Sequence, residues 1–360
     1  MRILVLGGTG SMGVPIVKLL GDQGNQVTVT SRRTRKSVKT NVVYSKGDAH
    51  DMDYLKELLT QHYQVIVDFM KYTEDELAER VKLLLRSTDQ YIFLSSARVY
   101  ADDVELNENS ERLLDSSTDV DFLNSNEYSL VKAREENILV QSHYKNWTIV
   151  RPYITYNVAR LQLGFFEKEQ WLYRVLKGRS VVIPREILQK ITTLTYGNDV
   201  AERICLLVGK KNALQQVFQI TSPESLTWNE VLNIYVTEIQ RVTGKDVKII
   251  VDGEAEKMAE CIGAEYQYRY DRELNRQFDC KKLNEFESNN LLYTEIHQGL
   301  ADCLKAFLQG NQKFGDCSWK LEAYEDRLTG ERTKLREIHA VSDKIKYIIW
   351  RYTPYLDYKL

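Results

Sequence analysis

The chain has 360 residues, of which 43% are hydrophobic and 28% are charged. This length is enough for two compact units, and the composition is that of a soluble globular protein. The 49 basic and 51 acidic residues nearly cancel, so the overall charge does not indicate a nucleic-acid partner. No apolar run approaches the roughly 18 residues of a membrane span. No secretory signal precedes the first predicted strand.

Cysteine and histidine usage argues against disulfides and metal sites. The five cysteines are odd in number and lack CxxC spacing, so we expect reduced thiols and a cytoplasmic protein. The five histidines show no HExxH or similar grouping, and we therefore expect no metal site.

The first predicted strand and helix are separated by a glycine-rich turn. Residues 2–6 form a short apolar run that suits a buried strand, and apolar residues at helical spacing follow from Val14. The glycines allow close approach of the backbone to a phosphate, and the start of the helix offers unpaired N–H groups to that anion. The pattern predicts a nucleotide site, with a turn that holds no ligand as the alternative. The candidate contacts are Gly7, Thr9, Gly10, Ser11, Met12 and Gly13.

The second predicted strand, residues 27–30, ends at Ser31-Arg32-Arg33, and this ending bears on the choice of cofactor. Sites that prefer NAD place an acidic residue here to hold the ribose 2′-hydroxyl. A hydroxyl beside a guanidinium suits the additional 2′-phosphate of NADP. We therefore predict NADP as the cofactor, with NAD as the alternative. A solvated basic loop would explain the same residues.

Three more strands are predicted at residues 42–45, 64–68 and 90–94. Asp48, after the first of them, is placed to cap a helix that begins near Met52. Thr73 and Glu76 form a capping box at the start of the next helix. The alternation of strands and helices predicts a parallel, doubly wound sheet.

The segment Ser95-Ser96-Ala97-Arg98-Val99-Tyr100 follows the fifth strand, and a YxxxK motif follows at Tyr128 and Lys132. The acidic residues 101–126 between them are expected as a surface loop, either a flap over a substrate or a solvated connection. Residues four apart on a helix share one face, so Tyr128 and Lys132 can point at one ligand. The ammonium favours the phenolate and lowers a pKa that starts near about 10. Such a phenol can exchange a proton with a hydroxyl or a ketone.

The GxxGxxG turn, the Ser-Ser-x-x-Val-Tyr segment and YxxxK, in this order, resemble the extended and atypical members of the short-chain dehydrogenase/reductase superfamily. The resemblance covers residues 1 to about 309. It implies Ser96, Tyr128 and Lys132 as catalytic residues of a hydride transfer, in which Tyr128 moves the accompanying proton. Further cofactor contacts that it implies are Ser31, Arg32, Arg33, Asp48, Ala49, Phe69, Met70, Lys71, Ser95, Tyr128, Lys132, Pro152 and Tyr153.

The resemblance also implies the fold and its division. We expect a Rossmann-type doubly wound parallel sheet with a smaller, mostly helical substrate lobe and an extra helical tail. Residues 1–155, with about 190–222 interleaved, would bind NAD(P), and residues 156–309 would form mainly the substrate lobe. Short strands are expected near residues 180–183, 217–220 and 247–251, and Asp199 is expected to cap a helix.

The substrate class is implied by the resemblance alone, because the extended members mostly act on nucleotide-activated sugars. The implied substrate contacts are Ser96, Arg98, Arg160 and Arg276; a surface ion pair is the alternative for Arg276. A 4,6-dehydratase is disfavoured, since Ala97 and Arg98 stand where such enzymes carry Asp-Glu. An epimerase and a keto-sugar reductase both stay open.

A third hypothesis is a member that kept the fold and lost the chemistry, and that binds a nucleotide or RNA. The segment Asp68-Phe69-Met70 departs from the small residues of most relatives and resembles the atypical branch. The intact Tyr128 and Lys132 and the near-neutral charge favour catalysis without a nucleic-acid partner.

Residues 310–360 fall outside the resemblance and are expected as a helical C-terminal extension, in which Leu328, Leu335 and Ile338 share helical spacing. Residues 344–352 mix basic, aliphatic and aromatic side chains. This segment, within 340–360, suits a peripheral membrane contact or a protein contact. A helix packed on the core or on a second subunit of a homodimer is the alternative.

Overall fold

The computed structural model describes all residues except 11, 287–290 and 354–360. The chain divides into two compact units. The first unit is Met1–Thr155, Thr193–Glu224 and Gln277–Thr294; the second unit is Tyr156–Thr192, Ser225–Arg276 and Glu295–Leu360. Residues 277–294, which the sequence placed in the substrate lobe, thus group with the first unit.

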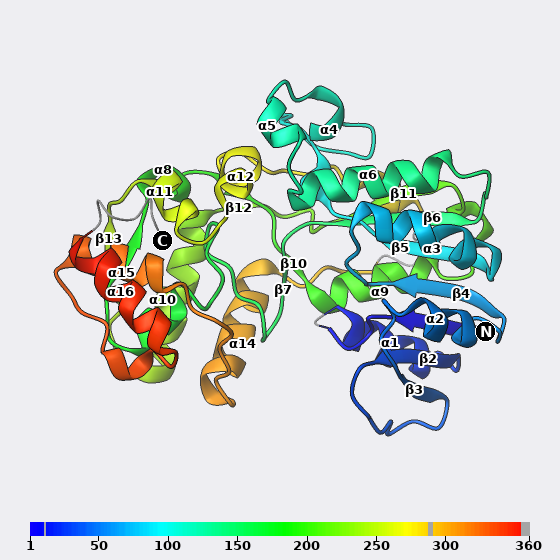
Figure 1. Cartoon of the computed structure of the whole chain (residues 1–360), viewed down its shortest axis with the longest axis horizontal. Helices are drawn as coiled ribbons and strands as arrows, with labels where there is room; N and C mark the ends of the chain where they lie inside the picture. Colours follow the sequence, from blue (N-terminus) through cyan, green and yellow to red (C-terminus); the bar gives the residue numbers. More distant parts are fainter. Residues whose placement is uncertain (11, 287–290, 354–360) are drawn as a thin grey trace. The chain divides into compact units, whose positions relative to one another are not determined.

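A seven-stranded parallel sheet forms the centre of the first unit (Figure 1). The strand order is β11-β6-β5-β4-β1-β2-β3, so the chain runs outward from β1 to β3 and then crosses to β4 on the other side of β1. The predicted Rossmann-type fold is therefore confirmed. The strands are β1 (Arg2–Leu6), β2 (Gln26–Ser31), β3 (Val42–Lys46), β4 (Tyr63–Asp68), β5 (Thr88–Leu94), β6 (Trp147–Pro152) and β11 (Gln216–Ile220).

Helices cover both faces of this sheet because its strands are apolar on both sides. Alternate residues of a strand point to opposite faces. Ile3 and Val5 of β1 belong to a core with α1 (Gly13–Asp22) and α9 (Gly197–Leu207). Leu4 and Leu6 belong to the opposite core with α2 (Met52–Leu58), α3 (Glu74–Arg86) and α6 (Tyr128–Gln141). The remaining helical segments of this unit are η1 (Ala97–Val99), α4 (Leu113–Ser116), α5 (Val120–Leu123), η2 (Lys211–Ala213) and α13 (Lys281–Phe286).

Two of the predicted helix caps are wrong. The cap of α2 is Asp51, whose carboxylate accepts from the N–H groups of Asp53 and Tyr54, whereas Asp48 accepts from the N–H of His50. Helix α9 begins at Gly197, so Asp199 lies in its first turn, where its carboxylate accepts from the N–H and the hydroxyl of Thr294. Helix α2 begins at Met52, as predicted, but Asp48 lies four residues before it, and the cap is the residue directly before the helix. Helix α9 begins two residues before Asp199, which places Asp199 inside the helix.

The second unit is mostly helical. Its small strands pair as β8 (Val181–Ile183) with β13 (Ile249–Val251) and β9 (Ile191–Thr192) with β12 (Leu226–Thr227). Of the two-residue strands, β10 (Thr195–Tyr196) belongs to the first unit, and β7 (Thr155–Tyr156) spans the point where the first unit ends and the second begins. The helical segments are α7 (Leu172–Leu176), α8 (Arg185–Leu188), α10 (Trp228–Thr243), α11 (Ala255–Glu260), α12 (Glu265–Gln267), the π-helical turn η3 (Tyr268–Arg272), α14 (Ile296–Gln309), α15 (Trp319–Thr329), η4 (Leu335–Glu337) and α16 (Val341–Tyr352).

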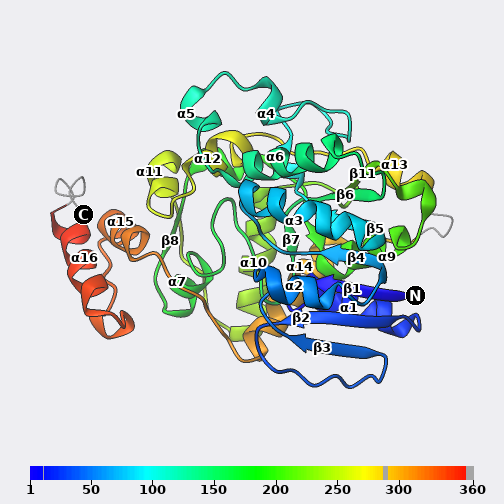
Figure 2. The ribbon, with the colours of Figure 1, turned by 45° about the vertical axis from the view of Figure 1, so that its right-hand side comes forward.

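The C-terminal extension is built of separate helices. Helix α15 ends at Gly330, whose φ of +73° is left-handed, so Leu328 and Leu335 do not share a helix with Ile338 as their spacing suggested. Ile338 is buried, whereas Leu328 and Leu335 are exposed. Helices α15 and α16 lie side by side (Figure 2).

A cluster of buried charges, which we call the Arg174 cluster, attaches α15 to the rest of the second unit. It comprises Arg174, Arg179, Glu322, Glu325 and Asp326. The guanidinium of Arg174 donates to Glu322 at 2.7 Å and to Asp326 at 3.1 Å, and it lies 3.4 Å from Glu325. Arg179 donates to Glu322 at 3.1 Å. Burial raises the pKa of Glu325 to about 8. The extension is therefore an integral part of the second unit.

Replacing Arg174 with methionine tests this attachment. The Arg174→Met variant leaves Glu325 and Asp326 buried without their cation, and we expect the free energy of unfolding to fall by about 3–5 kcal/mol. Chemical denaturation measures the change. The exposed Arg185 of α8 supplies the control, because Arg185→Met should change the stability by less than about 0.5 kcal/mol. Equal stability of the two variants would contradict the structural role of the cluster.

Candidate active site

Close packing of the backbone shapes the glycine turn between β1 and α1. Gly7 has a φ of +68°, which favours glycine. A Cβ atom at Gly8 would lie 2.7 Å from Val5, and one at Gly13 would lie 2.5 Å from the Cα of Gly8. At Gly10 the nearest atom to an added Cβ is the Gly7 carbonyl oxygen at 3.8 Å. Three glycines are therefore required by the turn itself, and Gly10 is not.

The start of α1 suits an anion. Met12 stands at the cap position without a side-chain hydrogen bond to the helix, and the first turn contains no acidic residue. Ser11 lies outside the described residues, so its predicted contact is not placed. The N–H groups of a ten-residue helix and the narrow glycine turn fit the phosphates of a dinucleotide.

The end of β2 presents two guanidinium groups. Ser31 uses its hydroxyl in the turn, where it donates to the Arg33 carbonyl at 2.8 Å. Arg32 and Arg33 are exposed. The residues at this place thus fit a 2′-phosphate through arginine charge more than through the hydroxyl of Ser31.

The segment after β4 lies against the glycine turn. A Cβ atom at Gly7 would meet the Met70 sulfur and the Phe69 carbonyl carbon, each at 3.2 Å. Lys71 follows with its ammonium 6.0 Å from the ring centre of Tyr128. Met70 therefore places a large side chain against the glycine turn, whereas Phe69 meets the turn with its backbone. After β3, Ala49 is buried beside the exposed Asp48.

Tyr128 is the first residue of α6 and is partly exposed. Two cations flank its ring: Lys71, and Arg98, whose guanidinium carbon lies 5.4 Å from the ring centre. Arg98 also forms an ion pair with Glu127. The Tyr128 hydroxyl makes no hydrogen bond to any residue that the structure describes. The phenol is therefore available to a ligand in a positive surrounding.

Lys132 is turned into the interior. Its ammonium lies 2.8 Å from a carboxylate oxygen of Glu135, in an ion pair rather than a well-directed hydrogen bond, and 4.6 Å from the ring centre of Phe93. Both charged side chains are buried. The YxxxK motif predicted that the charge of Lys132 acts on Tyr128. In the structure the ammonium of Lys132 also pairs with Glu135, which the motif did not indicate.

Asp68 is a second buried carboxylate in this region. It accepts hydrogen bonds from the hydroxyls of Tyr72 at 2.9 Å and Tyr91 at 2.7 Å. Burial raises the pKa of Asp68, and the positive charge of Lys132 partly offsets this. Burial also raises the pKa of Glu135 to about 7, against the opposing effect of Lys132. Two carboxylates thus share the field of one ammonium, and Glu135 takes up a proton near neutral pH.

The two serines after β5 have different surroundings. The Ser96 hydroxyl accepts from the N–H of Arg98 at 3.2 Å and caps η1. The Ser95 hydroxyl donates to Glu136 at 2.5 Å. Glu136 in turn accepts from Arg151 at 2.6 Å and 2.8 Å. The hydroxyl of Ser95, a predicted cofactor contact, is therefore committed to a buried network that sequence reasoning missed.

Four further predicted contacts lie at the end of β6 and in the second unit. Pro152 and Tyr153 come at the end of β6, and the buried ring of Tyr153 packs 4.9 Å from that of Phe278. In the second unit, Arg160 is half-exposed and pairs with Glu167. Arg276 is buried and donates to Asp271 at 3.1 Å and to the Tyr270 carbonyl at 2.7 Å. Arg276 thus forms a buried ion pair, not the surface pair considered above, and its burial argues against contact with a substrate.

The parallel sheet brings most of these residues together. The carboxyl ends of neighbouring parallel strands meet at one edge, and ligands of such sheets bind there. The turns after β1, β2, β4, β5 and β6 hold the glycines, the arginine pair, Lys71, Ser96 and Tyr153, respectively. Tyr128 approaches this group through its position over Lys71 and Arg98. Arg160 and Arg276 belong to the second unit.

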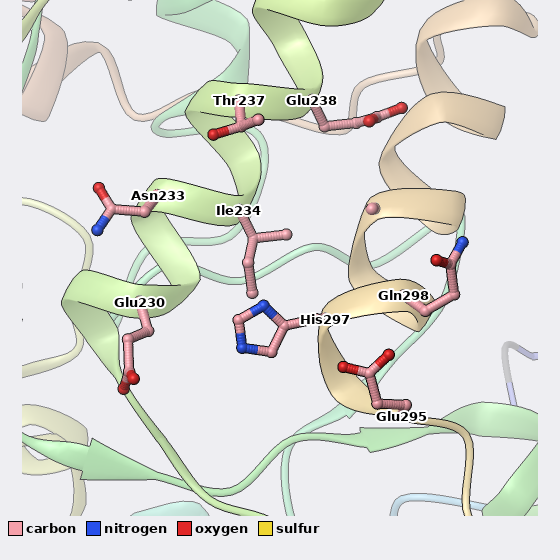
Figure 3. Close-up of a pocket in the computed structure, with 9 residues that line it drawn as sticks. Glu230, Asn233, Ile234, Thr237, Glu238, Glu295, His297 and Gln298 are labelled. Atoms are coloured by element: carbon pink, nitrogen blue, oxygen red, sulfur yellow. The ribbon is translucent and has the colours of Figure 1, made fainter.

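A separate groove lies between α10 and α14 in the second unit (Figure 3). Its volume is about 450 Å³. His297 of α14 reaches toward Ile234 of α10, and Glu230, Glu238 and Glu295 stand around them. None of the predicted site residues lines this groove.

The described residues lack the features of a metal site and of a membrane-spanning helix. The described part of the chain contains no group of three or more His, Cys, Asp or Glu side chains arranged to hold a metal ion. Among the same residues, no helix has the length and apolar character needed to cross a bilayer.

Comparison with known proteins agrees with the geometry. Residues 7–171 match the family model described as NAD(P)H-binding. The fold is similar to a dTDP-glucose 4,6-dehydratase from Bacillus anthracis solved with NAD (18% identity, TM-score 0.62, 86% of this chain and 97% of that chain). It is also similar to a UDP-glucuronic acid 4-epimerase from Bacillus cereus solved with NAD (16% identity, TM-score 0.61, 88% and 100%). At these identities the likeness shows the fold.

A curated relative is the chloroplast stem-loop binding protein of 41 kDa b from Arabidopsis thaliana. It is 27% identical over 245 residues, which are 63% of this chain. The match spans 60% of that protein's length.

The Glu135→Gln variant tests the buried proton site. A glutamic acid whose pKa rises on folding stabilises the fold fully below its ordinary pKa of 4.5 and loses this contribution as the pH rises through about 7. Glutamine cannot titrate. Between about pH 5 and pH 8 we therefore expect the wild type to lose roughly 3 kcal/mol of unfolding free energy relative to Glu135→Gln.

Thermal or chemical denaturation across this pH range measures the difference. The exposed Glu79 of α3 supplies the control, because Glu79→Gln should keep the pH dependence of the wild type. The proton site is refuted when Glu135→Gln and Glu79→Gln follow the same curve.

Proposed function

We propose that this chain, which has the NAD(P)H-binding domain and the fold of the extended short-chain dehydrogenases/reductases, is an NADP-dependent enzyme that acts on a nucleotide-activated sugar. The reaction is reduction of a 4-keto group or epimerisation at C4, with Tyr128 as the acid and base. The observation that carries this proposal is the unengaged hydroxyl of Tyr128 between two cations.

The role of Tyr128 is proton transfer at its hydroxyl oxygen. When bound, the nicotinamide of the cofactor supplies or accepts the hydride at the substrate carbon. Tyr128 moves the matching proton to or from the substrate oxygen. The charges of Lys71 and Arg98 lie 6.0 Å and 5.4 Å from the ring centre, so two cations adjoin the ring whose hydroxyl takes part in this transfer.

Ser96 is suited to orient the substrate oxygen. Its hydroxyl oxygen accepts the N–H of Arg98, which leaves the O–H free to donate. A hydrogen bond from Ser96 to the substrate oxygen, together with that of Tyr128, would hold the carbonyl in the plane that hydride transfer requires. Ser96 is buried, so this hydrogen bond would form with little competition from water.

Lys132 takes part through its charge rather than by an observed contact with Tyr128. Its ion pair with Glu135 weakens its field when Glu135 is ionised. When Glu135 is protonated, the ammonium of Lys132 acts at full strength on its surroundings. The state of Glu135 would therefore influence the charge near the reacting groups.

The substrate class rests on similarity in fold. A solved UDP-glucuronic acid 4-epimerase in complex with UDP-glucuronic acid and NAD has this fold, with 16% identity and a TM-score of 0.62. Ala97 and Arg98, where 4,6-dehydratases carry Asp-Glu, disfavour elimination of water. The arginines after β2 favour NADP, and a cofactor that is consumed suits a reductase more than an epimerase.

RNA binding is the second candidate, and the similarity to the stem-loop binding protein of Arabidopsis thaliana favours it. The net charge of −2 opposes it, because neutralisation of phosphates supplies most of the affinity of such complexes. A stem-loop RNA bound with a Kd below about 1 µM at physiological salt, without turnover of any nucleotide sugar, would favour this candidate.

Tyr128→Phe tests the proposed chemistry. Removal of the hydroxyl should lower turnover by about 10²- to 10⁴-fold, since the proton transfer loses its donor and acceptor. A panel of UDP- and dTDP-sugars with NADPH or NADP provides the assay. NADPH affinity, measured by fluorescence, should stay close to that of the wild type. Tyr144→Phe, beyond the other end of α6, is the matched control and should keep full activity. Full activity of Tyr128→Phe would refute the assignment.

Arg32→Ala tests the choice of cofactor. A guanidinium that binds the 2′-phosphate contributes a charged hydrogen bond, so its loss should raise the Kd of NADPH by roughly tenfold or more. The Kd of NADH should change less than about twofold, because NADH lacks that phosphate. The exposed Arg86 provides the control Arg86→Ala. A wild type that binds NADH more tightly than NADPH, or equal losses for both cofactors, would contradict the NADP preference.

A further inference from the structure

Helix α16 exposes a stripe of apolar side chains. Val341 is 69% exposed, Ile345 55%, Ile348 42% and Tyr352 47%. Their spacing of four, three and four residues places them on one face of the helix. We call this set the α16 stripe. The opposite face packs inward through the buried Tyr347 and the partly buried Trp350, which join a small core with Ala323 of α15.

The stripe is on the outside of the second unit. Figure 2 shows α15 along one side of α16, and no other described element lies on its outer side in that view. Among the described residues, the four side chains of the stripe stay 42–69% exposed. Apolar surface that is exposed in a row, rather than singly, marks an interaction site.

Basic residues flank the stripe. Lys344, Lys346 and Arg351 belong to α16, and Arg332, Lys334 and Arg336 are exposed in the segment before it. The guanidinium carbons of Arg332 and Arg351 lie 5.7 Å and 5.3 Å from the ring centre of Tyr352, so both basic groups adjoin the end of the stripe.

The acidic residues of the same segment face inward. Glu337 accepts from Arg179 at 2.8 Å, and Glu331 lies 3.5 Å from Arg174 and accepts from Ser180 at 2.8 Å and 3.0 Å. Their carboxylates are thus paired with arginines of the second unit. Apart from Asp343, the charges that remain between residues 331 and 353 are positive.

We propose that α16 lies flat on an anionic membrane surface, with the stripe inserted at the boundary of headgroups and acyl chains. Apolar side chains on one face and basic residues beside them are the features of an interfacial helix. The lysines and arginines would reach lipid phosphates, and the ring of Tyr352 suits the interface. This role goes beyond the proposed enzyme activity and does not depend on it.

Charge distinguishes a membrane from a second copy of the chain. A symmetric dimer through this face would bring the same patch of each subunit together. The basic residues would then face basic residues, which costs free energy. An anionic lipid surface has the complementary charge, and the structure therefore favours it as the occupant.

Helix α16 and the segment before it are attached to the Arg174 cluster by hydrogen bonds. Tyr347 donates to Asp326 of the Arg174 cluster at 2.6 Å, and Thr333 donates to Glu322 at 3.0 Å. Deletion of residues 310–360 would therefore disturb the second unit as well as remove the helix. Substitutions on the exposed stripe leave these contacts in place.

The experiment is sedimentation of the full chain with vesicles of phosphatidylcholine alone or with phosphatidylglycerol. We expect binding to the mixed vesicles, little binding to phosphatidylcholine alone, and a loss of binding as salt increases. The double variant Ile345→Gln with Ile348→Gln should bind at least about tenfold more weakly. Lys344→Gln with Lys346→Gln should bind about twenty-fivefold more weakly, at about fivefold for each charge.

A matched control is Val38→Gln with Val43→Gln, which removes two exposed aliphatic side chains of the first unit and should bind as the wild type does. An unchanged melting temperature shows that the stripe variants are folded. No binding of the wild type to the mixed vesicles at low salt overturns the proposal. So does equal binding by the stripe variant, or a dimer that the stripe variant converts to a monomer.

Discussion

The contact of two backbone segments in the glycine turn is the constraint on which the first unit depends. Gly8 and Gly13 approach so closely that a Cβ atom at Gly13 would lie 2.5 Å from the Cα of Gly8. This contact lets α1 begin directly after the glycine turn that follows β1. The ends of β2, β4 and β5 meet at the same edge because every pairing in the sheet is parallel.

The features that the sequence predicted correctly are local ones. Apolar runs predicted the strands of the large sheet, because buried parallel strands need few residues and are apolar on both faces. The capping box of Thr73 and Glu76 is present, since both partners lie within one turn. The order of three motifs predicted a Rossmann-type fold that binds NAD(P), and both the NAD(P)H-binding match over residues 7–171 and the observed fold agree with this prediction.

The features that the sequence did not predict depend on tertiary contacts. Nothing near Ser95 in the chain shows that it donates to Glu136, and the partner of Glu136, Arg151, comes from another strand. Lys132 points into the interior because it pairs with Glu135 and because both side chains are buried. The sequence shows that Glu135 lies three residues after Lys132, a spacing that allows the pair, but it does not show that the pair is buried. The prediction that Leu328, Leu335 and Ile338 share one helix was wrong for a local reason. The left-handed Gly330 ends α15 and interrupts the helical spacing of these residues.

The cations beside the Tyr128 ring have a kinetic consequence. Lys71 and Arg98 stand after β4 and β5, and the exposed Arg32 and Arg33 stand after β2, in a chain whose net charge is −2. The chain thus carries a local positive field at one edge of the sheet against a slightly negative background. A field of this kind guides anions during diffusion and raises the rate at which they reach the site, an effect that salt suppresses. Ligands that carry phosphate groups would therefore be attracted to this edge of the sheet before any contact forms.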